Sequence, residues 1–215
     1  FLIGLSFTMM IPGFLDLAEN HMNSSGFFVS SLFTFFIGFS LILVNRGGNK
    51  KIEIKSAFIL VMFSWLILSI FASLPFIAST GNLNITESFF EAVSGLTTTG
   101  STIISDIENT SRGIILWRAI LQWLGGIGII VSAISILPNL GVGGMQLFRL
   151  ESSDTSEKLL PRAASIASEI SVLYIALSVV CGISYWMIGL SPFNALVHAM
   201  STIATGGFSS KSGSI

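Results

Sequence analysis

Two short stretches rich in threonine and glycine contain the residues best suited to chemistry in this sequence. Their members are Thr97, Thr98, Thr99, Gly100 and Ser101 in the first stretch, and Ala204, Thr205, Gly206, Gly207 and Phe208 in the second. A cation that leaves water must exchange the oxygens of its hydration shell for protein oxygens, and backbone carbonyls perform this role in potassium filters. Glycine permits the positive φ that directs carbonyls inward, and a threonine hydroxyl adds an uncharged oxygen. Both stretches are therefore candidate cation sites.

A short helix is predicted immediately before each stretch, over 84–96 and 191–203. Asn84 begins a capping-box pattern, and Ser191 followed by Pro192 is typical of a helix start. A helix needs about 20 apolar residues to cross a bilayer, so both helices are too short to span. The negative end of each helix dipole would face the following stretch, which favours a cation there.

The two stretches belong to a predicted repeat with an offset of 107 residues. Under this shift 91–100 aligns with 198–207 without a gap, and Ala, Ser, Thr and Gly coincide at four of the ten positions. The apolar segments 56–78 and 164–190 fall into register under the same shift. The repeating unit is then a span, a short helix, a Thr/Gly turn and a second span. The alternative is that both stretches are ordinary loops between helices.

The composition indicates that lipid surrounds this chain. Of the 215 residues 52% are hydrophobic and only 10% are charged, with a mean hydropathy of +0.84. Soluble domains carry about 25% charged residues. The formal net charge of −1 provides no basic field, so we expect no nucleic-acid partner. One cysteine, two distant histidines and no paired acids in a pocket-like motif indicate that the protein is not an enzyme.

Five segments have the length and polarity of membrane spans, or nearly so: 1–18, 27–44, 56–78, 113–137 and 164–190. Lys and Arg favour the cytoplasmic side of a membrane. The segments 45–55 and 138–163 carry most of the Lys and Arg, whereas 16–26 and 79–112 are mainly acidic. We therefore expect 45–55 and 138–163 in the cytoplasm and the other two segments outside.

The parity of the crossings constrains the short helix 84–96. Two cytoplasmic segments must be separated by an even number of spans, and 56–78 and 113–137 already supply two. The helix 84–96 must therefore enter the membrane from outside and return to that side, and the same logic applies to 191–203. Non-helical backbone at membrane depth is tolerated only inside protein or beside a watery cavity. A permeation site is the natural interpretation.

Other residues in these segments also suggest specific roles. Arg118 beside Trp117 is interpreted as an anchor whose charged end reaches the membrane surface. Glu91 and His198, at equivalent positions of the repeat, either bond the Thr/Gly turns from behind or cap loops. Close helix packing is favoured over a gating hinge for the glycines of the fourth span, namely Gly125, Gly126 and Gly128.

Four stretches closely resemble segments of Trk-type potassium-uptake proteins, within the Trk/Ktr/HKT superfamily. The stretch 90–102 resembles the first filter segment, and 198–209 resembles the second. The stretch 121–130 is similar to the inner helix after the first filter, and 141–149 is similar to a cytoplasmic connection. The resemblance covers nearly the whole chain. It implies an all-α membrane protein whose transmembrane helices carry re-entrant pore loops.

The resemblance also implies how the chain is divided. Its parts are two N-terminal transmembrane helices (1–55), a first pore unit (56–137), a cytoplasmic linker (138–163) and a second pore unit cut off after its filter (164–215). A complete pore takes four such units, so we expect the other two from a missing C-terminal half or from a second chain. The implied potassium ligands are the backbone carbonyls of Thr98, Gly100, Thr205 and Gly207.

The resemblance implies potassium uptake across the cell inner membrane, with potassium as the transported substrate and without a cofactor. The implied partners are membrane lipid, a second copy in a homodimer and a cytosolic nucleotide-binding regulatory subunit. Two alternatives remain. One is a truncated, non-transporting remnant or membrane assembly module, because only two of four filter loops are present. The other is a secondary transporter that uses broken helices for a larger solute.

Overall fold

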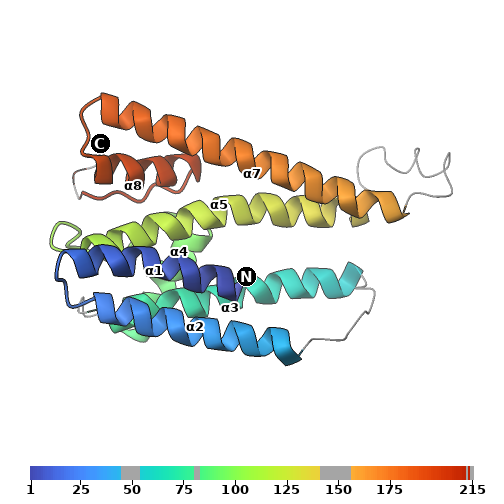
Figure 1. Ribbon diagram of the computed structural model, residues 1–215, viewed down its shortest axis with the longest axis horizontal. Helices are drawn as coiled ribbons and strands as arrows, with labels where there is room; N and C mark the ends of the chain where they lie inside the picture. Colours follow the sequence, from blue (N-terminus) through green and yellow to red (C-terminus); the bar gives the residue numbers. More distant parts are fainter. Residues whose placement is uncertain (45–53, 80–82, 141–155, 212, 214–215) are drawn as a thin grey trace.

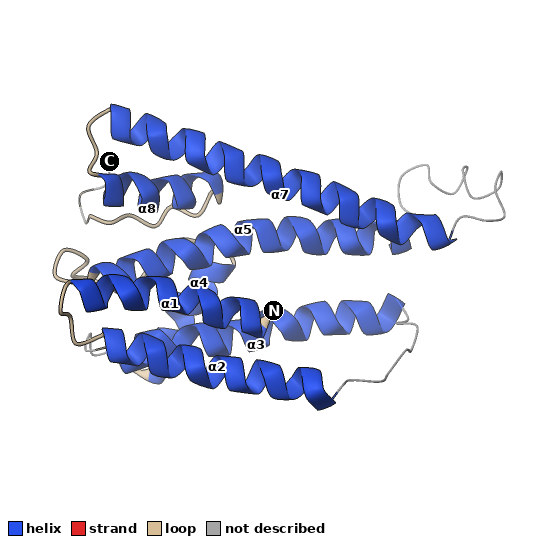
Figure 2. Cartoon of the chain, in the orientation of Figure 1, coloured by secondary structure: helices blue, strands red, loops and turns tan. Residues whose placement is uncertain are grey.

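The computed structural model describes residues 1–44, 54–79, 83–140, 156–211 and 213, and in these ranges it contains helices and no strand. The helices are α1 (Leu2–Ala18), α2 (Ser24–Val44), α3 (Ile54–Ala78), α4 (Ile85–Leu96), α5 (Arg112–Leu140), α7 (Ser156–Met187) and α8 (Pro192–Ile203). Figure 2 shows loops and turns between these helices in the described chain. The prediction of an all-α protein is confirmed.

Four helices contain segments long and apolar enough to cross a membrane: Ser24–Val44, Phe58–Ala78, Arg112–Ser132 and Ser165–Met187. Helix α1 is also apolar but has 17 residues, which is near the lower limit for a span. The helix bounds agree with the predicted spans and short helices to within a few residues, except that α7 begins at Ser156 rather than near 164. The prediction of an integral membrane protein is confirmed.

The long helices run side by side along the long axis of the molecule (Figure 1). The last residues of α2 and α5 and the first residues of α3 and α7 share one end of this bundle, on the right in Figure 1. The segments 45–55 and 138–163, predicted to be cytoplasmic, join helices at that end. Most of their residues, 45–53 and 141–155, lie outside the described residues.

The two short helices have 12 residues each and lie between longer ones. Helix α4 packs against α3 and α5, and α8 packs against α7 and α5. Figure 1 shows that α8 runs from one end of the bundle toward its middle, and that the chain then returns to the same end. Helix α5 thus contacts both short helices.

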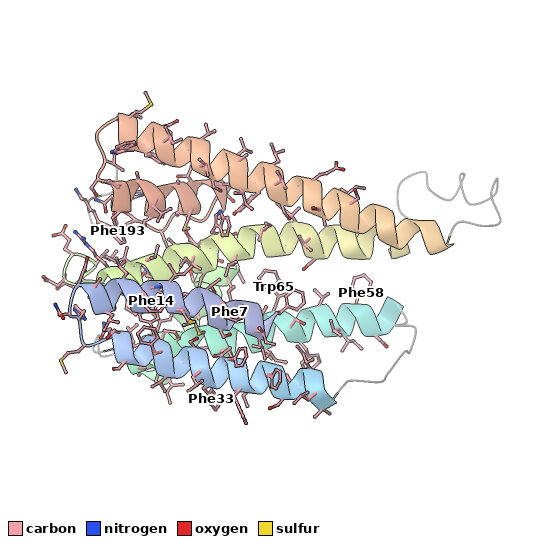
Figure 3. The ribbon with its side chains drawn as sticks, in the orientation of Figure 1. Phe7, Phe14, Phe33, Phe58, Trp65 and Phe193 are labelled. Carbon is pink, nitrogen blue, oxygen red and sulfur yellow. The ribbon has the colours of Figure 1, made fainter. Side chains whose placement is uncertain are left out.

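Large apolar side chains cover the outer surface of the bundle. Figure 3 shows Phe7, Phe14 and Phe33 on α1 and α2, and each of these rings is more than half exposed. In the apolar window of α7 only 6% of the residues are buried, compared with 61% in that of α5. An apolar surface of this extent fits contact with lipid or with other helices rather than with water.

The core forms around α5, whose buried Trp117 donates its indole N–H to the Ala72 carbonyl of α3 at 3.0 Å. At the start of α5, the carboxylate of Asp16 accepts hydrogen bonds from the Gly113 N–H at 2.7 Å and from the Ser111 hydroxyl at 3.0 Å. Asp16 is fully buried at the end of α1. Its place in the acidic segment 16–26 predicts a charge of an outer loop, whereas Asp16 joins α1 to the N-terminus of α5.

Candidate cation site

The first Thr/Gly turn follows α4 in a defined backbone conformation. Asn84 and Glu87 form the predicted capping box at the start of α4, with both hydrogen bonds at 2.9 Å. At the end of α4, three backbone N–H groups donate back to helix carbonyls: Thr97 to Val93 at 2.8 Å, Thr98 to Gly95 at 3.0 Å, and Thr99 to Ser94 at 3.0 Å. The φ angles of Thr98 and Gly100 are positive, at 55° and 79°.

The second turn repeats this geometry 107 residues later. The equivalent hydrogen bonds run from Ala204 to Met200 at 3.2 Å, from Thr205 to Thr202 at 2.9 Å, and from Gly206 to Ser201 at 2.9 Å. The φ angles of Thr205 and Gly207 are 54° and 83°, which match those of the first turn. The Ser191 hydroxyl accepts the Asn194 N–H at the start of α8, at the position equivalent to Asn84. The local structure therefore follows the repeat detected in the sequence.

A threonine at positive φ is unusual, because its branched side chain crowds the backbone in this conformation. Two such residues, Thr98 and Thr205, stand at equivalent places in the two turns. Strained backbone of this kind clusters at ligand sites, where surrounding contacts impose it. The strain therefore points to a functional conformation in both turns.

The two turns lie against one another. A Cβ atom added to Gly100 would overlap the carbonyl oxygen of Gly206. The exposed members of the two stretches are Thr97, Thr99, Ser101, Thr205 and Gly207. The half-buried members are Thr98 and Gly100, and the buried members are Ala204, Gly206 and Phe208. The structure thus brings the predicted site residues of both stretches together, but it turns the Phe208 side chain into the protein.

Glu91 of α4 bonds the chain just beyond the first turn. Its carboxylate accepts hydrogen bonds from the Thr102 hydroxyl at 2.9 Å and from the Ile103 N–H at 3.1 Å. It also pairs with Arg118 Nε at 2.7 Å, and both side chains are almost fully buried. The interpretation of Arg118 as a surface anchor is therefore wrong, because its charge is neutralised inside the protein by Glu91.

His198 of α8 stands in the place of Glu91 in the second unit. Its Nε2 lies 3.3 Å from the hydroxyl of Ser210, which also donates to Asn194 Oδ1 at 3.0 Å. Ser210 is equivalent to Ile103 under the shift of 107 residues. Glu91 and His198 thus bond equivalent points of the chain just beyond the two turns.

Helix α5 approaches the ends of both short helices at two glycines. A Cβ at Gly125 would overlap the carbonyl oxygen of Leu96, the last residue of α4. A Cβ at Gly126 would lie 2.5 Å from the Tyr174 hydroxyl and 3.2 Å from Ala204 Cα. These contacts support close packing, rather than a hinge, as the role of this pair.

Gln122 is a site residue that the sequence analysis did not single out. Its Oε1 accepts hydrogen bonds from the Ser201 hydroxyl at 2.8 Å and from the Phe208 N–H at 3.3 Å. Its side chain is fully buried within the most buried helix of the bundle. The available signal was its spacing of four residues from Arg118, which places two strongly polar side chains on one face of an apolar span.

In these turns the groups able to bind a cation are backbone carbonyl and hydroxyl oxygen atoms. No cluster of three or more His, Cys, Asp or Glu suited to a metal occurs among the residues that the structure describes. The turns follow the C-terminal ends of α4 and α8, whose dipoles favour positive charge. Such an arrangement suits a weakly bound, exchangeable monovalent cation.

The comparison with known proteins gives consistent matches. The family model described as "TrkH: Cation transport protein" matches residues 23–215. Trk system potassium uptake protein TrkI of Halomonas elongata is 50% identical over 157 residues, which are 73% of this chain and 32% of that protein. TrkH of Escherichia coli K12 is 40% identical over 97% of this chain and 44% of its own length.

A solved structure has the same fold. The crystal structure of the potassium transporter TrkH from Vibrio parahaemolyticus superposes with a TM-score of 0.84 and 36% identity, over 98% of this chain and 42% of that chain. This chain therefore spans less than half the length of the TrkH relatives it matches. Because the family model matches residues 23–215, the chain belongs to the TrkH family of cation transport proteins.

Proposed function

We propose that this chain takes part in potassium uptake across the cell inner membrane, by supplying two of the four filter loops of a pore. The observation that carries this proposal is the repeated geometry of the two turns, which share hydrogen bonds and positive φ angles at an offset of 107 residues. Contact between Gly100 and Gly206 places the turns beside one another, as loops around a common ion path require. The relatives bear the name of Trk potassium uptake proteins.

Potassium would be bound by backbone carbonyls in these turns. The proposed ligands are the carbonyls of Thr98, Gly100, Thr205 and Gly207, with the other members of the two stretches lining the path. Positive φ at all four positions lies outside the extended and right-handed helical regions and changes the direction of successive carbonyls. The carbonyls replace water ligands without adding charge, so the ion remains free to move on.

In this proposal α4 and α8 are re-entrant pore helices that enter from the outer side. They belong to pore units at 56–137 and 164–215, while 1–55 forms an N-terminal helix pair and 138–163 a cytoplasmic linker. The return of the chain after α8 to the end from which it came supports this arrangement (Figure 1). The linker is the proposed contact for a cytosolic nucleotide-binding regulatory subunit.

Two loops cannot surround an ion, so the pore requires two further loops. The TrkH relatives are more than twice as long as the region they share with this chain, and a C-terminal half or a second chain would supply the remaining units. A homodimer of complete subunits is the proposed assembly. The exposed apolar surface of α7 is available to lipid or to such additional helices.

Growth of a potassium-uptake-deficient bacterium on limiting potassium tests this proposal. The strain would express this chain alone, or this chain fused to the remainder of E. coli TrkH, with unmodified E. coli TrkH as the positive control. We expect the fusion to restore growth, and Gly100→Ser in the fusion to reduce it or to alter ion preference. Arg112→Gln, at an exposed ion pair, is the matched control and should leave growth unchanged. A fusion that is inserted in the membrane in normal amount, but does not restore growth, would favour a non-transporting assembly module.

A further inference from the structure

One face of α5 holds two buried polar side chains that contact the second Thr/Gly turn, and one of them also reaches the chain beyond the first turn through Glu91. Arg118 and Gln122 are four residues apart and therefore neighbours on this face. Arg118 is 1% exposed and Gln122 is 0% exposed. Strongly polar groups are expensive to bury within an apolar span, so their contacts indicate what they stabilise.

Arg118 connects the two units through two different interactions. On one side its Nε binds Glu91, whose carboxylate also holds Thr102 and Ile103 beyond the first turn. On the other side its guanidinium carbon lies 4.1 Å from the centroid of the ring of Phe208, the last residue of the second turn. A buried guanidinium over an aromatic face forms a cation–π contact in an environment where water does not weaken it.

Gln122 holds the second turn by its backbone. Its Oε1 accepts the Ser201 hydroxyl and the Phe208 N–H together. A flipped amide would place its NH₂ group against the Phe208 N–H, so two donors would face each other and this orientation is preferred. A side chain at Gly206 would overlap the Gln122 carboxamide. The second turn therefore fits directly against Gln122.

The second unit lacks a charged equivalent of Glu91. His198 occupies that place, where it hydrogen-bonds with Ser210 and its ring packs beside Tyr185, whereas Glu91 has an arginine partner. Phe208 then receives contacts from both Arg118 and Gln122, which belong to the first unit. The position of the second turn relative to the first is thus set largely by α5.

We propose that Arg118 and Gln122 are positioning residues that fix the spacing between the two turns, and thereby determine how strongly the pore prefers potassium to sodium. This inference rests on the proposed function. Selectivity depends on the number and geometry of the carbonyls around the ion. A change that leaves the turns folded, but relaxes their spacing, therefore alters ion preference before it abolishes transport.

The test is a double-mutant cycle in the fusion with E. coli TrkH, measuring potassium uptake and its competition by sodium. Arg118→Lys keeps the charge beside Glu91 but loses the planar group that stacks on the ring. Phe208→Leu removes the ring and keeps the backbone N–H that Gln122 accepts. We expect each single change to lower the potassium-to-sodium preference about threefold to tenfold. The double variant should be no worse than the stronger single variant, because both remove the same contact.

A second cation–π pair between α5 and the second unit provides the control. Arg112 of α5 lies 5.4 Å from the Phe193 ring centroid of α8, and its side chain is 59% exposed. Arg112→Lys, Phe193→Leu and their combination should leave ion preference unchanged. Gln122→Met, which removes the acceptor of the Phe208 N–H, should lower ion preference independently of the ring.

The outcomes separate this inference from the proposed function. Loss of uptake in the unmodified fusion would overturn both. Normal uptake, with an unchanged ion preference in Arg118→Lys and Gln122→Met, would overturn the positioning role alone. Strictly additive effects of Arg118→Lys and Phe208→Leu, or an equal change in the Arg112 control pair, would also overturn it. If Arg118→Lys does not insert in the membrane, Phe208→Leu and Gln122→Met decide the question.

Discussion

The carboxylate of Glu91 and the guanidinium of Arg118 form an ion pair with 2.7 Å between Oε1 and Nε, and their side chains are 0% and 1% exposed. Glu91 belongs to the short helix α4 and Arg118 to the long helix α5. Their contact therefore fixes the first turn to the helix that also supports the second. A buried pair has a large desolvation cost, so removal of one partner leaves a charge that the site cannot accommodate.

The first prediction concerns this pair. Glu91→Ala or Arg118→Ala should lower the free energy of unfolding by about 3–5 kcal/mol, because the remaining charge stays buried without its partner. Thermal unfolding of the chain in detergent measures the change. The exposed pair Arg112–Glu19, with 2.9 Å between its charged groups, is the control. Glu19→Ala should lower the free energy of unfolding by only about 0–1 kcal/mol. Equal effects at the buried and the exposed pair would contradict the role assigned to Glu91 and Arg118.

The second prediction concerns the carboxylate of Asp16. Asp16→Ala leaves the buried Gly113 N–H without its acceptor at 2.7 Å and should lower the free energy of unfolding by about 2–3 kcal/mol. Asp16→Asn keeps one acceptor oxygen and should cost less. The same unfolding assay compares the two variants. A cost for Asn as large as that for Ala would show that the negative charge, rather than the hydrogen bond to Gly113, joins α1 to α5.

The third prediction separates two glycines of α5. Gly125→Ala places a Cβ against the Leu96 carbonyl, whereas Gly128→Ala meets only the Trp65 ring at an ordinary 3.5 Å. Overpacking costs about 1–3 kcal/mol, and alanine otherwise favours a helix by about 1 kcal/mol over glycine. Gly125→Ala should therefore destabilise the chain and Gly128→Ala should stabilise it slightly. The sign of the difference in melting temperature decides the prediction, and the opposite order would exclude close packing as the reason for Gly125.

The helices were predictable because their signals are local. Apolar runs of span length and the capping residues at Asn84 and Ser191 determined most of the helix bounds. The predicted span 164–190 agrees with the apolar segment Ser165–Met187, and α7 extends before it to Ser156, through a stretch of mixed charge that has no apolar periodicity.

The two turns were located from composition and repeat, but the residues behind them were not. Arg118 next to Trp117 has the pattern of an interfacial anchor, and only the approach of α4 and of Phe208 shows that it is buried. Gln122 likewise has its partners about 80 residues away in sequence, at Ser201 and Phe208. Partners this distant leave no local pattern, so a single sequence does not disclose them.

The last prediction concerns the positive φ angles of Thr98 and Thr205, which are 55° and 54°. A left-handed conformation costs a residue with a Cβ about 1–2 kcal/mol relative to glycine. Thr98→Gly and Thr205→Gly should therefore raise the melting temperature of the chain in detergent, although each removes a hydroxyl. In the fusion with E. coli TrkH they should also weaken the preference for potassium, since glycine lets the turn sample other carbonyl orientations.

Thr110→Gly is the control for this prediction. It lies outside the turns and loses a hydroxyl bonded to the Asp106 carbonyl, so it should not raise the melting temperature. If the turn variants lowered stability as Thr110→Gly does, the threonine side chains would be stabilising the turns instead of straining them. Higher stability together with unchanged ion preference would show that the strained conformation has no role in selecting the ion.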